Sequence, residues 1–98
     1  MSDGTQENIL QEADRITAGD RQRDYDHPRR NHERIAAFWR AHITAKYGVD
    51  VPLTAEDAAW MMIYVKAARD MFTPKRDNLV DVAGYARCIE RIREVTAP

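Results

Sequence analysis

The sequence has a single cysteine, Cys88, and lacks any long apolar run. One cysteine cannot close a disulfide within the chain, which is typical of proteins in a reducing compartment. The longest uninterrupted apolar stretch, residues 58–65, is far shorter than the roughly 20 residues that a helix needs to cross a bilayer. The charged amino terminus also lacks the pattern of a signal peptide. We therefore expect a cytoplasmic protein with no membrane partner.

The chain also lacks an excess of positive charge, because 15 Lys and Arg residues stand against 16 Asp and Glu residues. Nonspecific nucleic-acid binding draws on a net positive field around the protein, so it is disfavoured here. No internal repeat, low-complexity tract or linker is visible, and residues 1–98 are expected to form one domain. A domain of 98 residues with 44% hydrophobic content has a thin core, which association with another chain would help to stabilise.

No stretch alternates polar and apolar residues with period two, so strands are not expected. Apolar residues recur with helical spacing instead, and capping or breaking residues flank the repeats: Asp3 or Thr5, Gly19, Pro28, Gly48 and Thr54. The sequence therefore predicts an all-α fold, a small four-helix bundle with helices at residues 5–18, 28–47, 55–72 and 77–95.

The second and third predicted helices carry different apolar surfaces. On the second helix the apolar residues form one stripe, which consists of Ile35, Phe38, Trp39 and Ile43. On the third helix they cover most of the circumference, as expected for a helix that is central or is shared with a second subunit. We therefore expect a homo-oligomer.

The fourth predicted helix combines an apolar arc with acids at its edge. Leu79, Val82, Ala83, Ala86 and Ile89 fill the arc, and Asp77 and Asp81 flank it beside Tyr85. A carboxylate at such a rim must be paired, hydrogen-bonded or bound to a metal, because removing water from an isolated charge is costly. Gly84 weakens the helix by about 1 kcal/mol relative to alanine, which indicates that another element packs closely there.

A turn of only four residues, Thr73–Arg76, makes the third and fourth helices an antiparallel hairpin. Equal steps from this turn place Asp81 opposite residues 66–69 and Asp77 near Asp70. Two interpretations follow. The charged residues form an ion-pair cluster that fixes the register of the hairpin, or Lys66 and Arg69 bind a phosphate and Asp81 holds them in place.

The polar loop of residues 20–28 is a second candidate site. It contains Arg21, Arg23, Tyr25 and His27, which offer guanidinium groups, an aromatic face and a side chain that titrates near neutral pH. These groups suit a phosphorylated or nucleotide-like ligand, although a solvated linker would have a similar composition. His27 and His32 match no zinc-ligand spacing, so neither zinc nor another cofactor is expected from these residues.

Several ordered motifs resemble a family of small uncharacterised all-α domains from phages and prophages. The resemblance covers residues 8–93, and no established activity comes with it. The motifs are Gly19-Asp20-Arg21-x-x-Asp24-Tyr25-x-His27-Pro28, Leu53-Thr54-x-Glu56-Asp57-x-x-x-Met61-Met62, Lys66-x-x-Arg69 and Arg76-Asp77-Asn78-x-x-Asp81-x-x-Gly84-Tyr85. Asp26 stands where the family pattern has glycine, so the turn of that loop is expected to differ.

The fourth helix is also similar, more distantly, to the last motif of MazG-like nucleoside triphosphate pyrophosphohydrolases. These all-α enzymes hold Mg²⁺ with acids of an E-x-x-E helix and an E-x-x-D helix. Asp77 and Asp81 approximate the second motif at a spacing of four instead of three. Met62, Val65 and Lys66 stand at the level of the first motif, which argues against the usual metal cluster because a hard cation needs several oxygen ligands.

The resemblance to the pyrophosphohydrolases implies a Mg²⁺ site that includes Asp77 and Asp81. Glu56 and Asp57 of a neighbouring subunit would complete this site, since they lie too far along their own hairpin to reach it.

Three hypotheses for the function follow from the sequence. The first is a phage-type accessory protein that binds a nucleotide or another phosphorylated small molecule, or a divergent metal-dependent pyrophosphohydrolase. Its candidate ligand-binding residues are Arg21, Arg23, Tyr25, His27, Lys66, Arg69, Asp77, Asp81 and Tyr85. The second is a non-enzymatic protein that binds a host protein, and the third is a purely structural helical oligomer.

Overall fold

The computed structural model describes residues 6–18 and 26–96, and over these residues the chain is entirely helical with no strand. It contains the helices α1 (Ile9–Ala18), α3 (Pro28–Tyr47), α4 (Ala55–Phe72) and α5 (Arg76–Thr96). The predicted all-α class with four helices is confirmed for this part of the chain. The bounds of α3 and α4 are as predicted, and α5 extends one residue beyond its predicted bounds at each end.

Helix α1 begins at Ile9, later than the predicted start at residue 5. The side chains of Asn8 and Gln11 each accept a hydrogen bond of 2.9 Å from the backbone N–H of the other. This reciprocal pair satisfies two amide groups that the first helical turn leaves without partners. The predicted caps Asp3, Thr5 and Gly19 lie outside the described residues.

The predicted ends of α3 and α4 are confirmed by their capping geometry. Pro28 occupies the first turn of α3, and Gly48 ends this helix with a left-handed φ of 69°. At the start of α4, Thr54 and Asp57 form a reciprocal capping box.

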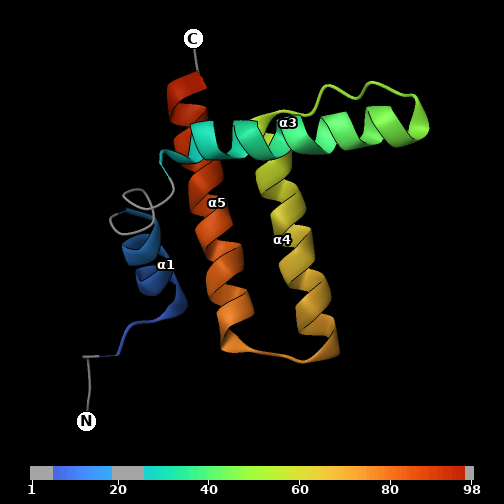
Figure 1. Cartoon of the computed structure of the whole chain (residues 1–98). Helices are drawn as coiled ribbons and strands as arrows, with labels where there is room; N and C mark the ends of the chain where they lie inside the picture. Colours follow the sequence, from blue (N-terminus) through green and yellow to red (C-terminus); the bar gives the residue numbers. More distant parts are fainter. Residues whose placement is uncertain (1–5, 19–25, 97–98) are drawn as a thin grey trace.

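Figure 1 shows α4 and α5 side by side, joined at one end by a short connection. Helix α3 lies across the opposite end of this pair, and its carboxyl-terminal half projects beyond α4 (Figure 1). Helix α1 packs against α5, and α4 makes its most extensive contacts with α5. The arrangement departs from a bundle in which all helices share one axis.

The crosswise position of α3 changes which of its residues are buried. Its buried residues are Pro28, His32 and Ala36, all in its amino-terminal half. The predicted stripe was wrong for Phe38, whose exposed fraction is 78%. A helix that contacts its neighbours at a crossing point buries only a patch, so a stripe along its full length does not form a core.

The core is built from small side chains. Ala55 and Ala59 of α4 pack against Ile89 and Ile92 of α5, with Ile63 beside them. Small residues let two helices approach closely, but they bury little apolar area. The large apolar side chains of α4 therefore remain outside this core, and Trp60, Tyr64, Met71 and Phe72 are all exposed.

The buried face of α5 also differs from the predicted arc. Leu79 and Ala86 are exposed, whereas Val80, Gly84 and Cys88 are buried. These last three line a small cavity together with α1 residues. The apolar pattern of α5 does not reveal that α1 covers this side of the helix, which explains why the predicted arc was wrong.

The connection between α4 and α5 is organised by Asp70. Its Oδ1 accepts hydrogen bonds from the backbone N–H of Lys75 at 3.0 Å and from the amide of Asn78 at 3.2 Å. These two donors lower the pKa of Asp70, the Lys75 amide first, because they stabilise the charged carboxylate. The residue of α5 that meets Asp70 is thus the buried Asn78 and not Asp77.

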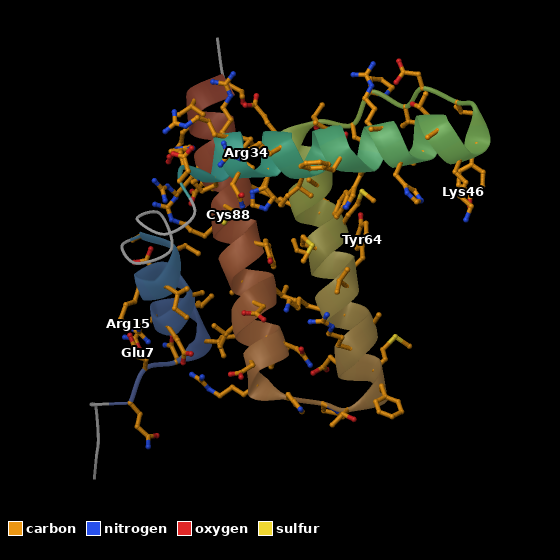
Figure 2. All side chains as sticks on the ribbon, viewed as in Figure 1. Glu7, Arg15, Arg34, Lys46, Tyr64 and Cys88 are labelled. Carbon is orange, nitrogen blue, oxygen red and sulfur yellow. The ribbon has the colours of Figure 1, made fainter. Side chains whose placement is uncertain are left out.

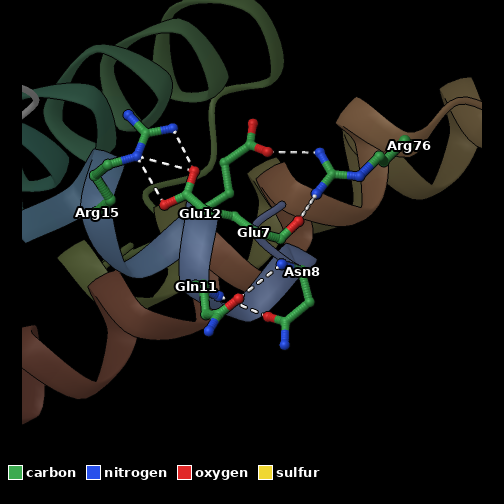
Figure 3. Close-up of polar contacts among 6 residues, drawn as sticks. All are labelled: Glu7, Asn8, Gln11, Glu12, Arg15 and Arg76. Atoms are coloured by element: carbon green, nitrogen blue, oxygen red, sulfur yellow. Dashed lines mark hydrogen bonds and ion pairs between the residues drawn. The ribbon is translucent and has the colours of Figure 1, made fainter. Parts of the chain in front are cut away.

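Polar contacts attach α1 to α5 at both ends. Arg76 donates to the Glu12 carboxylate at 2.5 Å and to the backbone carbonyl of Glu7 at 3.0 Å (Figure 3). At the other end, Arg91 donates to the carbonyl of Thr17 at 3.0 Å. Among the described helices, none is long and apolar enough to cross a membrane.

The packing of α1 against Gly84 leads to a stability prediction. A Cβ atom at Gly84 would lie 3.6 Å from Cγ2 of Thr17, which is an ordinary van der Waals contact. We expect Gly84→Ala to raise the free energy of unfolding by about 0.5–1 kcal/mol, because alanine favours the helix more than glycine does. Urea denaturation measures this change.

The matched control is Ala86→Gly, at an exposed position of the same helix. It should lower the free energy of unfolding by about as much as Gly84→Ala raises it. A destabilised Gly84→Ala variant beside a normally behaving control would mean that α1 lies closer to α5 than the structure places it.

Candidate functional site

The first predicted contact of the site is present. The Nζ of Lys66 lies 3.0 Å from Oδ2 of Asp81, and this ion pair joins α4 to α5. The Lys66 side chain is only 15% exposed, whereas that of Asp81 is 42% exposed. The carboxylate therefore compensates a largely buried ammonium group while part of it still faces water.

Asp81 and Tyr85 line a small cavity between α5 and α1. Gly84 and Thr17 also border it, and its volume is about 20 Å³. This volume accommodates a water molecule but no larger ligand. Beyond the cavity, the ring of Tyr85 meets the buried ring of His32 edge to face, with centroids 6.0 Å apart.

His27 occupies the amino-terminal cap of α3. Its Nδ1 accepts a hydrogen bond of 3.0 Å from the backbone N–H of Arg29. The pKa of His27 is lowered by burial first, and then by the positive charges of Arg91, Arg30 and Arg29. Three guanidinium groups from α3 and α5 therefore act on this imidazole, and the carboxylate of Asp26 opposes them.

Asp26, directly before His27, has a left-handed backbone with a φ of 72°. Among the described residues other than glycine, no other has a positive φ. Its carboxylate binds Arg30 through two hydrogen bonds of 2.8 Å and lies 3.5 Å from Arg34. These contacts hold the pKa of Asp26 far below its usual value, with the Arg30 hydrogen bond as the largest cause.

Asp26 stands where the resembling family has glycine, and a different turn remains our prediction for this position. Its backbone has the left-handed conformation that glycine favours, and ion pairs with Arg30 and Arg34 accompany this geometry.

The other predicted ligand-binding residues are not gathered at this place. Arg69 and Asp77 are exposed, and Asp77 lies in the first turn of α5. Arg21, Arg23 and Tyr25 lie outside the described residues. The structure thus pairs Lys66 of α4 with Asp81 of α5, beside Tyr85. It places His27 near Arg29 and Arg30 of α3 and Arg91 of α5.

The acids proposed for Mg²⁺ have other partners within the chain. Both oxygens of Glu56 bind Arg93, at 2.8 and 2.7 Å, and Asp57 belongs to the capping box of α4. Within residues 6–18 and 26–96, no group of three or more His, Cys, Asp and Glu side chains is placed to hold a metal ion. Since Mg²⁺ needs several oxygen ligands, the donors that these residues of one chain offer do not fit a Mg²⁺ site.

A larger open groove runs beside α3, with a volume of about 990 Å³. Alanines of α3 form much of its lining, and Leu53 and Ile92 add apolar surface. Its charged side chains pair with charged neighbours, as Arg40 does with Asp50 at 2.5 Å. The groove has the size of a ligand site, but these ion pairs compensate the charges that a phosphate would bind.

Sequence reasoning missed His32 and Arg91. His32 is buried, and its Nδ1 lies 2.8 Å from the carbonyl oxygen of Pro28. The signal in the sequence for this contact is the spacing of four residues between Pro28 and His32, which places them one above the other on a helix. Arg91 gave no local signal, because its neighbours His27 and Thr17 are remote in sequence.

The Lys66–Asp81 pair leads to a prediction about stability. We expect Asp81→Asn to lower the free energy of unfolding by about 1–2 kcal/mol, because it leaves the largely buried Lys66 ammonium without its charged partner. Urea denaturation of Asp81→Asn, Lys66→Met and the double variant forms a cycle that isolates the pair.

In this cycle the double variant should lose less free energy of unfolding than the sum of the losses in the two single variants. A cycle with no coupling between the two positions would contradict a structural role of the ion pair and place Asp81 in open solvent.

Comparisons with known proteins place the chain among phage proteins of unknown function. The Gene 55 protein of Mycobacterium phage L5 is 44% identical over 87 residues, which cover 88% of this chain and 53% of that protein. The Gene 55 protein of Mycobacterium phage D29 is 39% identical over 89 residues, 90% of this chain and 55% of that protein. The chain thus spans about half the length of these relatives. No solved structure matches it.

The family model described as "Domain of unknown function (DUF6378)" matches residues 8–93, the same range as the resemblance to small phage domains. The match covers most of the sequence, and the chain belongs to this family.

Proposed function

We propose that this domain binds a phosphorylated small molecule, of the size of a nucleotide, at the amino-terminal end of α3. The observation that carries the proposal is the convergence of Arg29, Arg30 and Arg91 near His27, whose pKa is lowered by burial and by these charges while Asp26 opposes them. A phosphate at this place would be favoured by the same charges that disfavour a proton on the imidazole.

The orientation of α3 supports this location. The amino terminus of a helix carries a partial positive charge, and acidic side chains usually lie in its first turn. The first turn of α3 contains no acid, and Arg29 and Arg30 lie there instead. Arg29 is paired with Glu33 at 3.3 Å and Arg30 with Asp26 at 2.8 Å, so a bound anion would share these guanidinium groups with the two carboxylates.

The remaining candidate residues have distinct roles in the proposal. Arg21, Arg23 and Tyr25 directly precede α3 in the sequence and would add guanidinium and aromatic contacts to the ligand. Lys66 of α4, held by Asp81 of α5, would be a second cationic contact. Because Arg69, Asp77 and Tyr85 do not adjoin His27, they are less favoured as ligand residues.

Metal-dependent hydrolysis of nucleoside triphosphates is an alternative function. It rests on the distant resemblance to MazG-like enzymes and requires Mg²⁺ at Asp77 and Asp81 with carboxylates from another subunit. Glu56 is bound to Arg93, and Asp81 to Lys66. A nearby ammonium opposes cation binding, so binding without catalysis is the preferred function.

The two phage relatives favour a role as an accessory protein, and we propose the host cytoplasm as its place of action. A second candidate function is binding of a protein, because several large apolar side chains of α3 and α4 are exposed.

The proposal predicts stabilisation by phosphate-bearing ligands. Pyrophosphate and a panel of ribonucleoside and deoxynucleoside triphosphates should raise the melting temperature without added metal. A ligand at about 100 times its Kd adds about 2.7 kcal/mol to the free energy of unfolding. Differential scanning calorimetry measures this shift, and assays of the same panel for pyrophosphate release, with and without Mg²⁺ or Mn²⁺, test catalysis.

Matched variants locate the site. Arg30→Gln should weaken binding about tenfold, because it removes one charge-assisted contact. The control variant is Lys46→Gln. Lys46 lies near the opposite end of α3, so this substitution should leave binding unchanged. If the protein released pyrophosphate only with metal, and Asp81→Asn abolished this release, catalysis would replace binding as the function. If the protein neither bound nor hydrolysed any ligand of the panel, the nucleotide proposal would be wrong.

The lowered pKa of His27 predicts that binding depends on pH. A bound anion raises the lowered pKa of His27, so binding is accompanied by proton uptake and strengthens as the pH falls through the raised pKa of the complex towards the lower pKa of the free protein. Each unit of increase in this pKa strengthens binding about tenfold at low pH. Isothermal titration calorimetry in buffers of different ionisation enthalpy measures the uptake.

His27→Asn is the control for this prediction, because asparagine caps a helix well but does not titrate. The ligand's own titration is the same for both proteins. If the two proteins showed the same pH dependence, the anion would not lie near His27.

A further inference from the structure

The outer face of α4 carries a continuous apolar seam. Trp60, Tyr64, Ala67 and Met71 follow one another at spacings of four, three and four residues, the pattern of one helix in a two-helix coiled coil. All four are exposed, with exposed fractions of 61% for Tyr64 and 87% for Met71. Figure 2 shows Tyr64 on the side of α4 that faces away from α5.

The seam projects at the carboxyl-terminal end of α4 and borders a hollow at the amino-terminal end. Met71 and Phe72 project at the last turn of α4, and Phe72 is 90% exposed. At the first turns, Trp60 and Tyr64 border a hollow of about 480 Å³ that is also lined by Val51, Leu53, Asp57 and Met61. The hollow and the projection lie on the same helix and are both mostly apolar.

We propose that this face of α4 binds the same face of a second copy of the chain, with the two helices antiparallel about a twofold axis between Tyr64 and Ala67. Such an arrangement is closed, because each copy offers one hollow and one projection. It is independent of the proposed function, since His27 lies at the start of α3.

The side chains that would meet in this arrangement are complementary in size. Tyr64 faces Ala67 of the second copy, so a large ring packs over a small side chain. Trp60 faces Met71 of the second copy, and a thioether adapts well to an aromatic ring. The indole N–H of Trp60 already donates to Glu56 at 3.3 Å, which leaves the ring itself for apolar contact.

The charges at the rim of the seam are also complementary. The antiparallel arrangement brings Asp57 to the level of Pro74 and Lys75 of the second copy. Asp57 and Lys75 are both exposed and carry opposite charges. In a parallel arrangement each of these residues would instead face its own counterpart, with like charges together.

The exposed area is adequate for a stable dimer. The four large side chains Trp60, Tyr64, Met71 and Phe72 expose on the order of 600 Å² in total, near the upper limit for an apolar patch on a monomer. A standard interface buries about 800 Å² on each partner, and Ala67, Ala68 and the hollow supply the remainder.

The experiment measures the mass of the purified chain by sedimentation equilibrium, with helicity followed by circular dichroism. We expect a dimer, with twice the monomer mass of 11.3 kDa. Tyr64→Glu and Met71→Glu should each raise the dimer dissociation constant by at least about 30-fold without loss of helicity, because both side chains are exposed within one copy. Phe38→Glu, at a 78% exposed apolar residue of α3, should leave the mass unchanged.

A second measurement tests the orientation in a Cys88→Ser background. Oxidation of a mixture of Trp60→Cys and Met71→Cys chains should give a disulfide-linked dimer that neither chain forms alone. Crosslinking of each chain with itself would overturn the antiparallel arrangement. A fully helical monomer at micromolar concentration, or equal weakening by Phe38→Glu, would overturn the proposed interface.

Discussion

The close contact between α4 and α5 is the constraint on which the rest of the structure depends. Ala55 and Ala59 lie against Ile89 and Ile92, and Ala59 is completely buried. Small side chains on α4 let the isoleucines of α5 reach its backbone, so the two helices have one favourable register. The same contact buries little apolar area, and the structure must gain stability elsewhere.

Polar contacts at three levels agree with this register. Glu56 meets Arg93 near one end of the helix pair, Lys66 meets Asp81 in the middle, and Asp70 meets Asn78 beside the connection. Solvent-accessible ion pairs contribute little to stability. A register shift of one residue would nevertheless break all three contacts at once. Their main effect is therefore to specify how α4 and α5 align, and this alignment positions Asp81 and Tyr85 beside α1.

The parts of the fold that the sequence predicted are those governed by local chemistry. Gly48 ends α3 and Thr54 begins α4 because capping depends on residues within a few positions. The position of Asp81 opposite Lys66 was predictable because a short turn leaves little freedom of register. Periodicity failed for Phe38 and Leu79, since an apolar stripe does not say which neighbouring helix will cover it.

For the candidate site too, local chemistry was predictable from the sequence and contacts between helices were not. His27 was identified from the chemistry of its loop, but its neighbour Arg91 comes from α5, and their proximity is a property of the fold alone. Asp26 is a similar case. The sequence offered a departure from the family pattern at this position, but its left-handed backbone and the ion pairs of its side chain with Arg30 and Arg34 are visible only in the structure.

The two candidate surfaces lie on different sides of the molecule, and this bears on the metal question. At about 100° per residue, Lys66 lies on the opposite side of α4 from Tyr64, and it faces Asp81 of α5. A second copy on the outer face of α4 would therefore bring its Asp57 towards Lys75 and not towards Asp81. The carboxylates that a Mg²⁺ site would need stay apart in that dimer. The proposed interface would thus weaken the hydrolase alternative and would leave the arginines around His27 open to the proposed ligand.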